Sequence, residues 1–211
     1  MIELHNCDCM DYMKTLEDKA FDLAIVDPPY GIGWATETKG KWVASRLPKK
    51  DWDKLAPENN YFKELRRVSD NQIVFGGNYF KELWPTRGFI VWDKGAGFKG
   101  RSYAESELAW TSFDKNSKII THDPLANKDY VGKIHPTQKP VKLYDWLLAN
   151  YAKPGDKILD THLGSGSSAI AAHYAGYDFV GCELDKDYFE AAKKRFNEET
   201  RQKELFACEK G

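Results

Sequence analysis

The sequence predicts an α/β fold: one Rossmann-like domain with a mainly parallel, seven-stranded sheet and helices on both faces. Several short apolar runs end abruptly at polar, glycine or proline residues, as buried strands do. Patterns typical of helices lie between many of these runs, and this alternation is characteristic of parallel sheets. The chain has 211 residues, which is about the size of one domain. We therefore expect a single domain over residues 1–211.

Taken in order, the apolar runs that we expect to form strands are 2–4, 21–26, 72–75, 88–92, 108–111, 157–159 and 178–182. The expected helices are 9–16, 60–68, 141–151, 167–175 and 186–206. Two segments, 31–58 and 112–134, fit neither pattern; the first is basic and rich in tryptophan and lysine, the second polar and irregular. Long irregular segments in a compact domain are usually functional or disordered, so both are candidate functional insertions.

Composition excludes several classes of protein. No stretch approaches the roughly 20 apolar residues that span a membrane, and the N-terminus has no signal-peptide pattern. The expectation is a cytoplasmic protein with no membrane contact. Cys7 and Cys9 form a lone C-x-C pair, while Cys182 and Cys208 stand apart, and the five histidines form no ligand motif. We expect free thiols and no metal site.

Local charge says more than the net charge of -1, which by itself does not indicate a nucleic-acid partner. Between Glu37 and Lys54, six basic residues stand against three acidic ones, and Lys94 lies in a second, glycine-rich basic loop. Such loops are often merely solvated, so phosphate contact depends on support from the motifs. The candidate DNA contacts are Trp34, Lys39, Lys41, Arg46, Lys49, Lys50, Lys99 and Arg101.

The strongest functional signal is Asp27-Pro28-Pro29-Tyr30, directly after the run 21–26. Ligands of open α/β sheets bind outside the carboxyl ends of strands, where this tetrapeptide falls. Asp27 and the carbonyl of Pro28 would accept two N–H bonds from an exocyclic base amine and make its nitrogen more nucleophilic. The prolines would stiffen the turn, and Tyr30 would stack on the base. A plain Pro-Pro turn over a packed ring is the weaker interpretation at a strand end.

A strand, a glycine turn and a small-residue helix are predicted at 157–172. Gly164 and Gly166 would let a ligand approach the backbone closely. Glu183 ends the next strand, where an acid is placed to accept hydrogen bonds from ribose hydroxyls. The pattern indicates an adenosine-containing ligand; it also suits a nicotinamide nucleotide, although a third glycine is missing. Other residues of this predicted cofactor turn are Asp160, His162 and Ser165.

The segment His135-Pro136-Thr137-Gln138-Lys139-Pro140 leads into the helix expected at 141–151. Thr137 and Lys139 would meet the carboxylate of a methionine group, aided by backbone N–H groups at the helix start. Alone, the motif is explained as well by a rigid helix entry. Asp8, which follows the first short strand, is a further candidate cofactor residue, and the neighbouring cysteines are expected to pack.

Together these segments resemble the amino-methyltransferases of DNA, specifically the permuted (beta) group in which D-P-P-Y precedes the glycine motif for S-adenosylmethionine (AdoMet). The resemblance covers most of the chain. It implies a site-specific enzyme that transfers a methyl group from AdoMet to an exocyclic amine of a flipped base in double-stranded DNA. Asp27, Pro28 and Tyr30 would handle the base, and Asp8 would lie near the base or the AdoMet adenine.

The same resemblance assigns Glu183 to the ribose and the Gly164–Gly166 turn, with Thr137 and Lys139, to the methionine end. The family usually has proline and phenylalanine where this chain has Thr161 and His162. His162 keeps a flat ring, so AdoMet binding is expected to persist. Aspartate at position 27 favours adenine-N6, because cytosine-N4 relatives more often carry serine there.

Other functions stay open at this point. Related sites methylate RNA bases or protein, the glycine turn alone would suit a nicotinamide-dependent oxidoreductase, and a non-catalytic DNA- or AdoMet-binding module is a third alternative. The segments 31–58 and 112–134 are the places for target recognition, and both are short. A short target, or a second copy of the chain in a homodimer, would fit that size. A role in restriction-modification is part of the same expectation.

Overall fold

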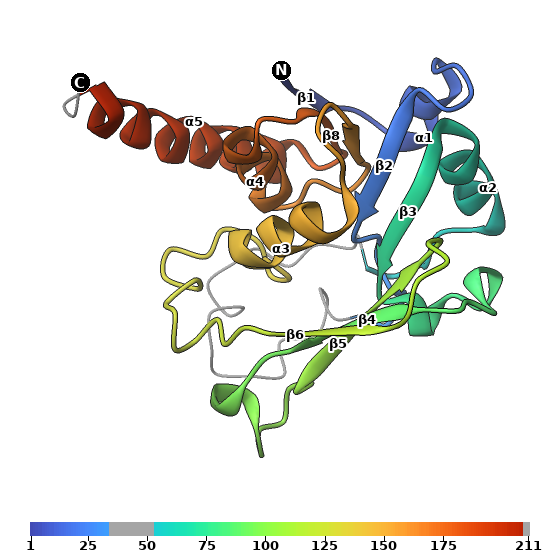
Figure 1. Cartoon of the computed structure of the whole chain (residues 1–211), viewed down its shortest axis with the longest axis horizontal. Helices are drawn as coiled ribbons and strands as arrows, with labels where there is room; N and C mark the ends of the chain where they lie inside the picture. The colour runs from blue at the N-terminus through green and yellow to red at the C-terminus, as the bar shows by residue number, and fades with distance from the viewer. Residues whose placement is uncertain (34–52, 209–211) are drawn as a thin grey trace.

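The structure is a computed structural model that describes residues 1–33 and 53–208, with side chains up to residue 201. Among these residues, eight strands form one sheet in the order β1-β8-β7-β2-β3-β5-β4-β6 (Figure 1). The strands are β1 (Ile2–Asn6), β2 (Phe21–Val26), β3 (Ser69–Phe75), β4 (Phe89–Asp93), β5 (Ser106–Thr111), β6 (Lys118–Thr121), β7 (Lys157–Asp160) and β8 (Asp178–Glu183).

Most neighbours in the sheet run parallel. The pairs from β1 through β8, β7 and β2 to β3 are all parallel, whereas β5 is antiparallel to β3 and to β4. β6 pairs in parallel with β4 at the edge. The predicted α/β fold with a mainly parallel sheet is confirmed.

Helices cover both faces of the sheet (Figure 1). They are α1 (Cys9–Lys14), α2 (Asn59–Val68), α3 (Val141–Tyr151), α4 (Ser167–Ala175) and α5 (Lys186–Cys208), with short 3₁₀ turns η2 (Gly77–Tyr79), η3 (Lys81–Leu83) and η4 (Ala96–Phe98). Alternate residues of β2 enter opposite cores: Leu23 and Ile25 pack in the core of α3 and α4, and Ala24 and Val26 in that of α1 and α2. This period of two is what a strand buried on both faces produces.

The described sheet has one more strand than the apolar runs predict. β6 lies inside segment 112–134, which the sequence describes as irregular. Only four residues long and on the sheet edge, it buries little: Ile119 is 70% exposed. A short edge strand has little apolar surface to bury, so the sequence of β6 does not show the apolar run typical of a buried strand. None of the helices in the described ranges is long and apolar enough to cross a membrane.

Candidate active site

The carboxyl ends of β1, β2, β7 and β8 surround a pocket of about 870 Å³. Ends of parallel strands meet at one edge of a sheet, which is where ligands of such folds bind. Nine of the predicted site residues line this pocket: Asp8, Asp27, Pro29, Thr137, Lys139, His162, Gly164, Ser165 and Glu183. The structure therefore brings together motifs that are more than 100 residues apart in the chain.

Four predicted site residues are not part of the pocket lining but adjoin residues that are: Pro28, Tyr30, Asp160 and Gly166. Tyr30 nonetheless contacts the site directly, because its hydroxyl donates a hydrogen bond to Asp27 Oδ1 at 2.7 Å. The backbone N–H groups of Tyr30 and Gly31 both donate to Asp53 Oδ1, at 2.9 and 3.0 Å. Asp53 is 2% exposed, and it fixes the turn that carries Asp27.

The ring of Tyr30 is enclosed by residues that follow β3. Tyr79 stacks on it, Phe80 meets it edge-on with centroids 6.2 Å apart, and the backbone of Gly76 lies against it. Gly76 has a φ of +67°, and a side chain there would overlap the ring. The position of Tyr30 is thus set by β3 and its following turn as well as by D-P-P-Y.

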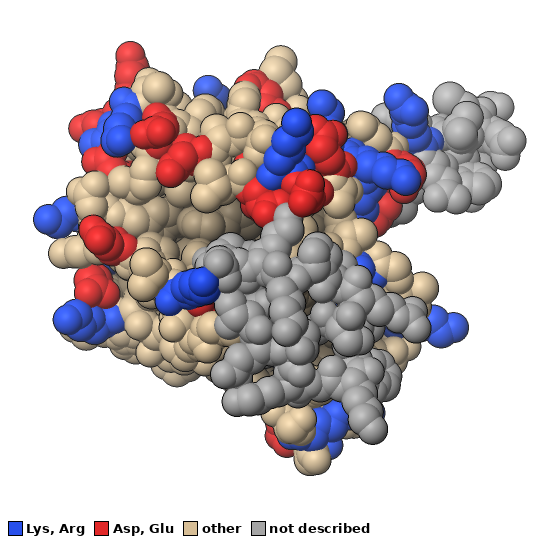
Figure 2. Space-filling view, turned by 180° about the vertical axis from the view of Figure 1, so that it is seen from behind, with Lys and Arg blue, Asp and Glu red and all other residues tan. Residues whose placement is uncertain are grey.

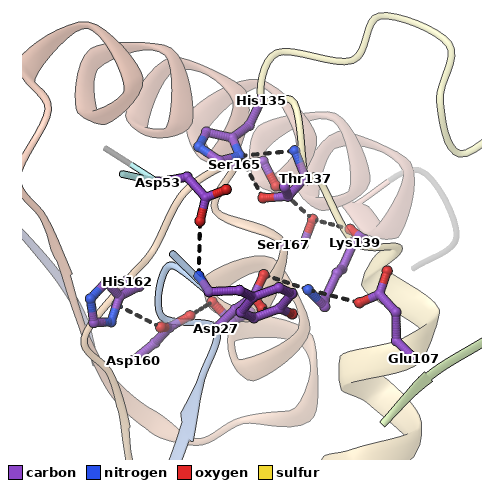
Figure 3. Close-up of polar contacts among 12 residues, drawn as sticks. Asp27, Asp53, Glu107, His135, Thr137, Lys139, Asp160, His162, Ser165 and Ser167 are labelled. Carbon is purple, nitrogen blue, oxygen red and sulfur yellow. Dashed lines mark hydrogen bonds and ion pairs between the residues drawn. The ribbon is translucent and has the colours of Figure 1, made fainter. Parts of the chain in front are cut away.

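Lys139 lies on the pocket lining, but its ammonium group points to carboxylates. It contacts Asp27 Oδ2, and it lies 3.2 Å from Glu107 Oε2 (Figure 3). The side chain is 3% exposed. The sequence assigned Lys139 to a methionine carboxylate; the structure instead gives its charge to Asp27 and Glu107.

Lys94 differs in the same way from its expected place in a solvated basic loop. Its ammonium lies 2.7 Å from Glu107 Oε1, and its side chain is only 9% exposed. A buried ammonium in an ion pair is not available to a phosphate group. Lys99 and Arg101, just after η4, are exposed.

The glycine turn after β7 is held by Asp160. This carboxylate accepts hydrogen bonds from the His162 N–H at 3.0 Å and from the Ser168 hydroxyl at 2.6 Å. Burial raises the pKa of Asp160 to about 7. Asp160 is thus an internal support of the turn. Gly166, at φ +76°, is the N-cap of α4.

Glu183 faces the pocket with its carboxylate fixed by two backbone donors. The N–H of Gly164 donates to Oε2 and that of Asp185 to Oε1, each at 2.9 Å. A carboxylate offers about four acceptor sites, so a group of this kind can bind hydroxyl donors of a ligand. Asp8, the N-cap of α1, similarly accepts from Met10 N–H at 2.7 Å while lining the pocket.

His162 is oriented by two hydroxyls. Its Nδ1 lies 2.9 Å from Thr161 Oγ1, which is in turn 2.6 Å from the hydroxyl of Tyr61 in α2. Burial lowers the pKa of His162 to about 4, so the ring is neutral at neutral pH. The backbone N–H of Thr137 donates a hydrogen bond to His135 Nδ1 at 3.3 Å, and the Thr137 hydroxyl lies 3.2 Å from the same nitrogen.

Sequence reasoning missed several contributors, namely Asp53, Tyr61, Tyr79 and Glu107. Asp53 lies in a segment that was interpreted as solvated and basic, and Tyr61 has the pattern of an ordinary core residue of an amphipathic helix. Glu107 precedes an apolar run and carries no motif. Their contacts with the site span 22 to 100 residues of sequence, so no local signal marks them.

Six of the candidate DNA contacts lie outside the described residues: Trp34, Lys39, Lys41, Arg46, Lys49 and Lys50. On the face that Figure 2 shows, basic and acidic side chains are interspersed. Across the described ranges, the structure places no group of three or more His, Cys, Asp or Glu side chains where they could hold a metal ion.

Known proteins resemble this chain over most of its length. The chain is 26% identical to the Type II methyltransferase M2.DpnII of Streptococcus pneumoniae, over 94% of this chain and 90% of that protein. The M1.HpyAVI–SAM complex has a TM-score of 0.61 at 20% identity, covering 92% of this chain and 100% of that one. The cytosine-N4-specific PvuII DNA methyltransferase has a TM-score of 0.59 at 16% identity, covering 92% and 86%. These two likenesses concern the fold.

A family model decides the identity. The N6_N4_Mtase model, described as DNA methylase, matches residues 76–194, more than half of the chain. The match includes β4 to β8, the Lys139 segment and the glycine turn. The chain belongs to this DNA methylase family.

Proposed function

We propose that the protein transfers a methyl group from AdoMet to the exocyclic amine of a flipped base in double-stranded DNA, and that the base is adenine, methylated at N6. The observation that carries this proposal is the Asp27 carboxylate. It faces the same pocket as the glycine turn and Glu183, and Tyr30 and Lys139 hold its two oxygens. An acceptor beside a nucleotide-type pocket is what amine methylation requires.

The pocket fits AdoMet as the methyl donor. Gly164, at φ +53°, lines the pocket and has no side chain, so a ligand can approach its backbone closely. The Glu183 carboxylate would accept the ribose hydroxyls, Asp8 would lie near the adenine, and Thr137 and Ser165 would face the methionine end. AdoMet supplies an electrophilic methyl group on a sulfonium centre. The AdoMet complex of M1.HpyAVI, which has the same fold, supports this assignment.

Asp27 acts on the acceptor amine. Its carboxylate accepts one N–H of the amine and the Pro28 carbonyl accepts the other, so the nitrogen lone pair turns toward the methyl group. The C–N bond forms as the S–C bond breaks, the sulfur keeps the electron pair, and the methylated nitrogen then loses one proton to water. Alignment in the pocket supplies much of the acceleration. No covalent enzyme intermediate is needed, and burial raises the pKa of the Cys9 thiol to about 12, which leaves it a poor nucleophile.

The DNA must deliver its base to this pocket. Flipping costs a few kcal/mol, which phosphate contacts help to offset. We assign target recognition to segments 31–58 and 112–134 and phosphate contacts to Lys99 and Arg101. The small size of both segments favours a short target or a second copy of the chain.

Aspartate at position 27 favours adenine; cytosine-N4 is the alternative, since the PvuII enzyme shares the fold. The test incubates the protein with tritiated AdoMet and unmethylated genomic DNA, RNA or protein, and digests the labelled product for mass spectrometry. N6-methyldeoxyadenosine is the expected product, and N4-methyldeoxycytidine would reassign the base. Labelled RNA or protein with silent DNA would overturn the proposal. Asp27→Ala should abolish transfer and largely spare AdoMet binding in calorimetry.

A further inference from the structure

Four side chains of alternating charge form a chain that leads from Asp27 into the antiparallel part of the sheet. Lys139 contacts Asp27 and lies 3.2 Å from one oxygen of Glu107, and Lys94 lies 2.7 Å from the other oxygen (Figure 3 draws the first three). Asp27 follows β2, Lys139 precedes α3, Glu107 belongs to β5 and Lys94 follows β4. These four charged side chains thus connect the pocket with the antiparallel strands β4 and β5.

The two lysines are almost fully withdrawn from water. The side chains of Lys139 and Lys94 are 3% and 9% exposed, and those of Asp27 and Glu107 are 14% and 24% exposed. Lys139 Nζ also lies 4.5 Å from the centre of the Phe75 ring. Buried ion pairs give little net stability compared with apolar residues of the same volume. A gain in stability is therefore a weak explanation for these four buried charges. Their position beside Asp27 indicates a role in the proposed reaction.

We propose that Lys139 and Glu107 are positioning residues: Lys139 holds one oxygen of Asp27, and Glu107 holds Lys139 in place, so that the Asp27 carboxylate stays ionised and oriented for the acceptor amine. This inference rests on the proposed function and adds two residues to its machinery. It gives Lys139 a task at the base rather than at the cofactor. Glu107 positions the Asp27 carboxylate through Lys139.

The electrostatics follow the geometry. Burial raises the pKa of Asp27, and the ammonium of Lys139 opposes that rise. Burial would lower the pKa of Lys139, but Asp27 and Glu107 raise it above its ordinary value. Burial would likewise raise the pKa of Glu107, but Lys139 and Lys94 lower it to about 2. Lys139 and Glu107 are therefore both charged at neutral pH. The other titratable groups that interact with Asp27 are Tyr30, Tyr61, Tyr144 and Asp160.

Removing each charge has a different consequence for Asp27. In Lys139→Met, the carboxylate loses the cation that favours its ionised form, so its pKa rises. In Glu107→Gln, the anion that disfavours the ionised form of Asp27 disappears, while Lys139 loses its anchor. The first variant should therefore move the acid limb of the pH profile upward, and the second should lower the rate without an upward shift. General damage to the fold does not produce this difference.

The experiment measures kcat/KM for methylation of unmethylated genomic DNA from pH 5 to 9, together with AdoMet binding by calorimetry. For Lys139→Met we expect the acid limb to rise by about 1 pH unit or more, with AdoMet affinity largely retained. Lys142→Met is the matched control: it removes an exposed lysine three positions away, paired only with Asp145, and should leave the profile unchanged. An unmoved acid limb, or loss of AdoMet binding in Lys139→Met, would overturn the inference.

Folding of the variants is checked by thermal melting. If Lys139→Met unfolds, the double variant Lys139→Met/Glu107→Gln removes the buried carboxylate as well, and the amide at position 107 can still accept a hydrogen bond from Lys94. The double variant should still show the upward shift, because its Asp27 also lacks the cation, and an unmoved limb would again overturn the inference. The two proposals fail separately: a wild-type protein that methylates no DNA overturns the proposed function. An active wild type whose variants keep its pH profile overturns only the role of Lys139 and Glu107.

Discussion

The ring of Tyr79 lies nearly parallel to that of Tyr30, with centroids 4.9 Å apart and planes inclined by 14°. Tyr30 in turn donates its hydroxyl to Asp27. A residue of the turn after β3 thus stabilises the side chain that holds the proposed catalytic carboxylate. Tyr79 is itself 49% exposed, so it contributes little to the core.

Replacing Tyr79 should therefore affect methyl transfer more than stability. A stacked aromatic pair is worth about 0.5–1.5 kcal/mol, which corresponds to roughly a 2- to 10-fold loss of kcat/KM in Tyr79→Ala. Tyr79→Phe keeps the ring and should keep the activity. Tyr174→Ala removes an exposed tyrosine from α4 and serves as the control. Equal kcat/KM for Tyr79→Ala and the wild type would show that the stacking has no role in the reaction.

The close approach of Gly76 to Tyr30 gives a second prediction. A Cβ at Gly76 would lie 2.6 Å from Cδ1 and Cζ of the ring, so Gly76→Ala must displace either Tyr30 or the backbone. We expect a loss of transfer together with a loss of stability beyond the roughly 1–2 kcal/mol that a left-handed alanine costs. Chemical denaturation and the methylation assay measure the two effects.

Gly176 provides a matched control for this substitution. Its backbone is in the same left-handed conformation, at φ 77° and ψ 23° against 67° and 21° for Gly76, but nothing lies within 4 Å of an added Cβ. Gly176→Ala should show the conformational strain alone, with full activity. If both variants behave alike, the contact with Tyr30 is not a constraint.

Burial of Asp160 predicts that stability falls with rising pH. Its pKa is raised to about 7 in the folded protein, against about 3.9 for an unfolded chain. Between these values the folded state binds the extra proton, so the free energy of unfolding decreases by up to about 1.4 kcal/mol per pH unit. The contribution of this group is greatest below the unfolded pKa and is lost as pH rises through the folded pKa.

The variant Asp160→Asn isolates this effect from other titrations. Its amide can still accept the hydrogen bond of His162, but it does not ionise. Denaturant unfolding between pH 5 and 8 should give a steeper decline for the wild type than for the variant. His162 does not account for a difference between the two pH dependences, because burial lowers its pKa to about 4 and both proteins contain it. Parallel curves would mean that Asp160 is ionised throughout.

Local sequence predicted much of the fold and the centre of the site. The helices α3 and α4 begin and end where expected, and D-P-P-Y and the glycine turn lie at the ends of β2 and β7. A buried strand followed by a turn depends on adjacent residues, so its pattern can be read directly. Lys94 shows the limit: a lysine next to glycines has the pattern of a solvated loop, and its partner Glu107 is visible only in the folded chain.

Long-range contacts account for the rest. Lys139 reaches Asp27 across 112 residues, and Asp53 bonds Tyr30 across 23, in neither case with a spacing that marks the pair. A lysine before a helix suggests an anion of the ligand, and nothing local indicates that the anion belongs to the protein. Lys139 does line the pocket, as the sequence predicts, but its ammonium group contacts Asp27 and Glu107 of the protein itself.

Exposed Lys99 and Arg101 give the last prediction, which concerns the proposed contact with DNA. Each cation that neutralises a phosphate releases a counterion, so the salt dependence of binding reports the number of contacts. The double variant Lys99→Ala/Arg101→Ala should weaken binding of duplex DNA and reduce the slope of log K against log salt by about 1.8, or 0.9 for each contact.

The matched control is Lys193→Ala/Lys194→Ala, which removes two exposed cations from α5. Fluorescence anisotropy at several salt concentrations measures both slopes. A slope equal to that of the wild type in Lys99→Ala/Arg101→Ala would place these side chains away from the phosphates. Equal reductions in both double variants would indicate a general effect of net charge, because a local contact depends on which cations are removed whereas a general attraction depends only on their number.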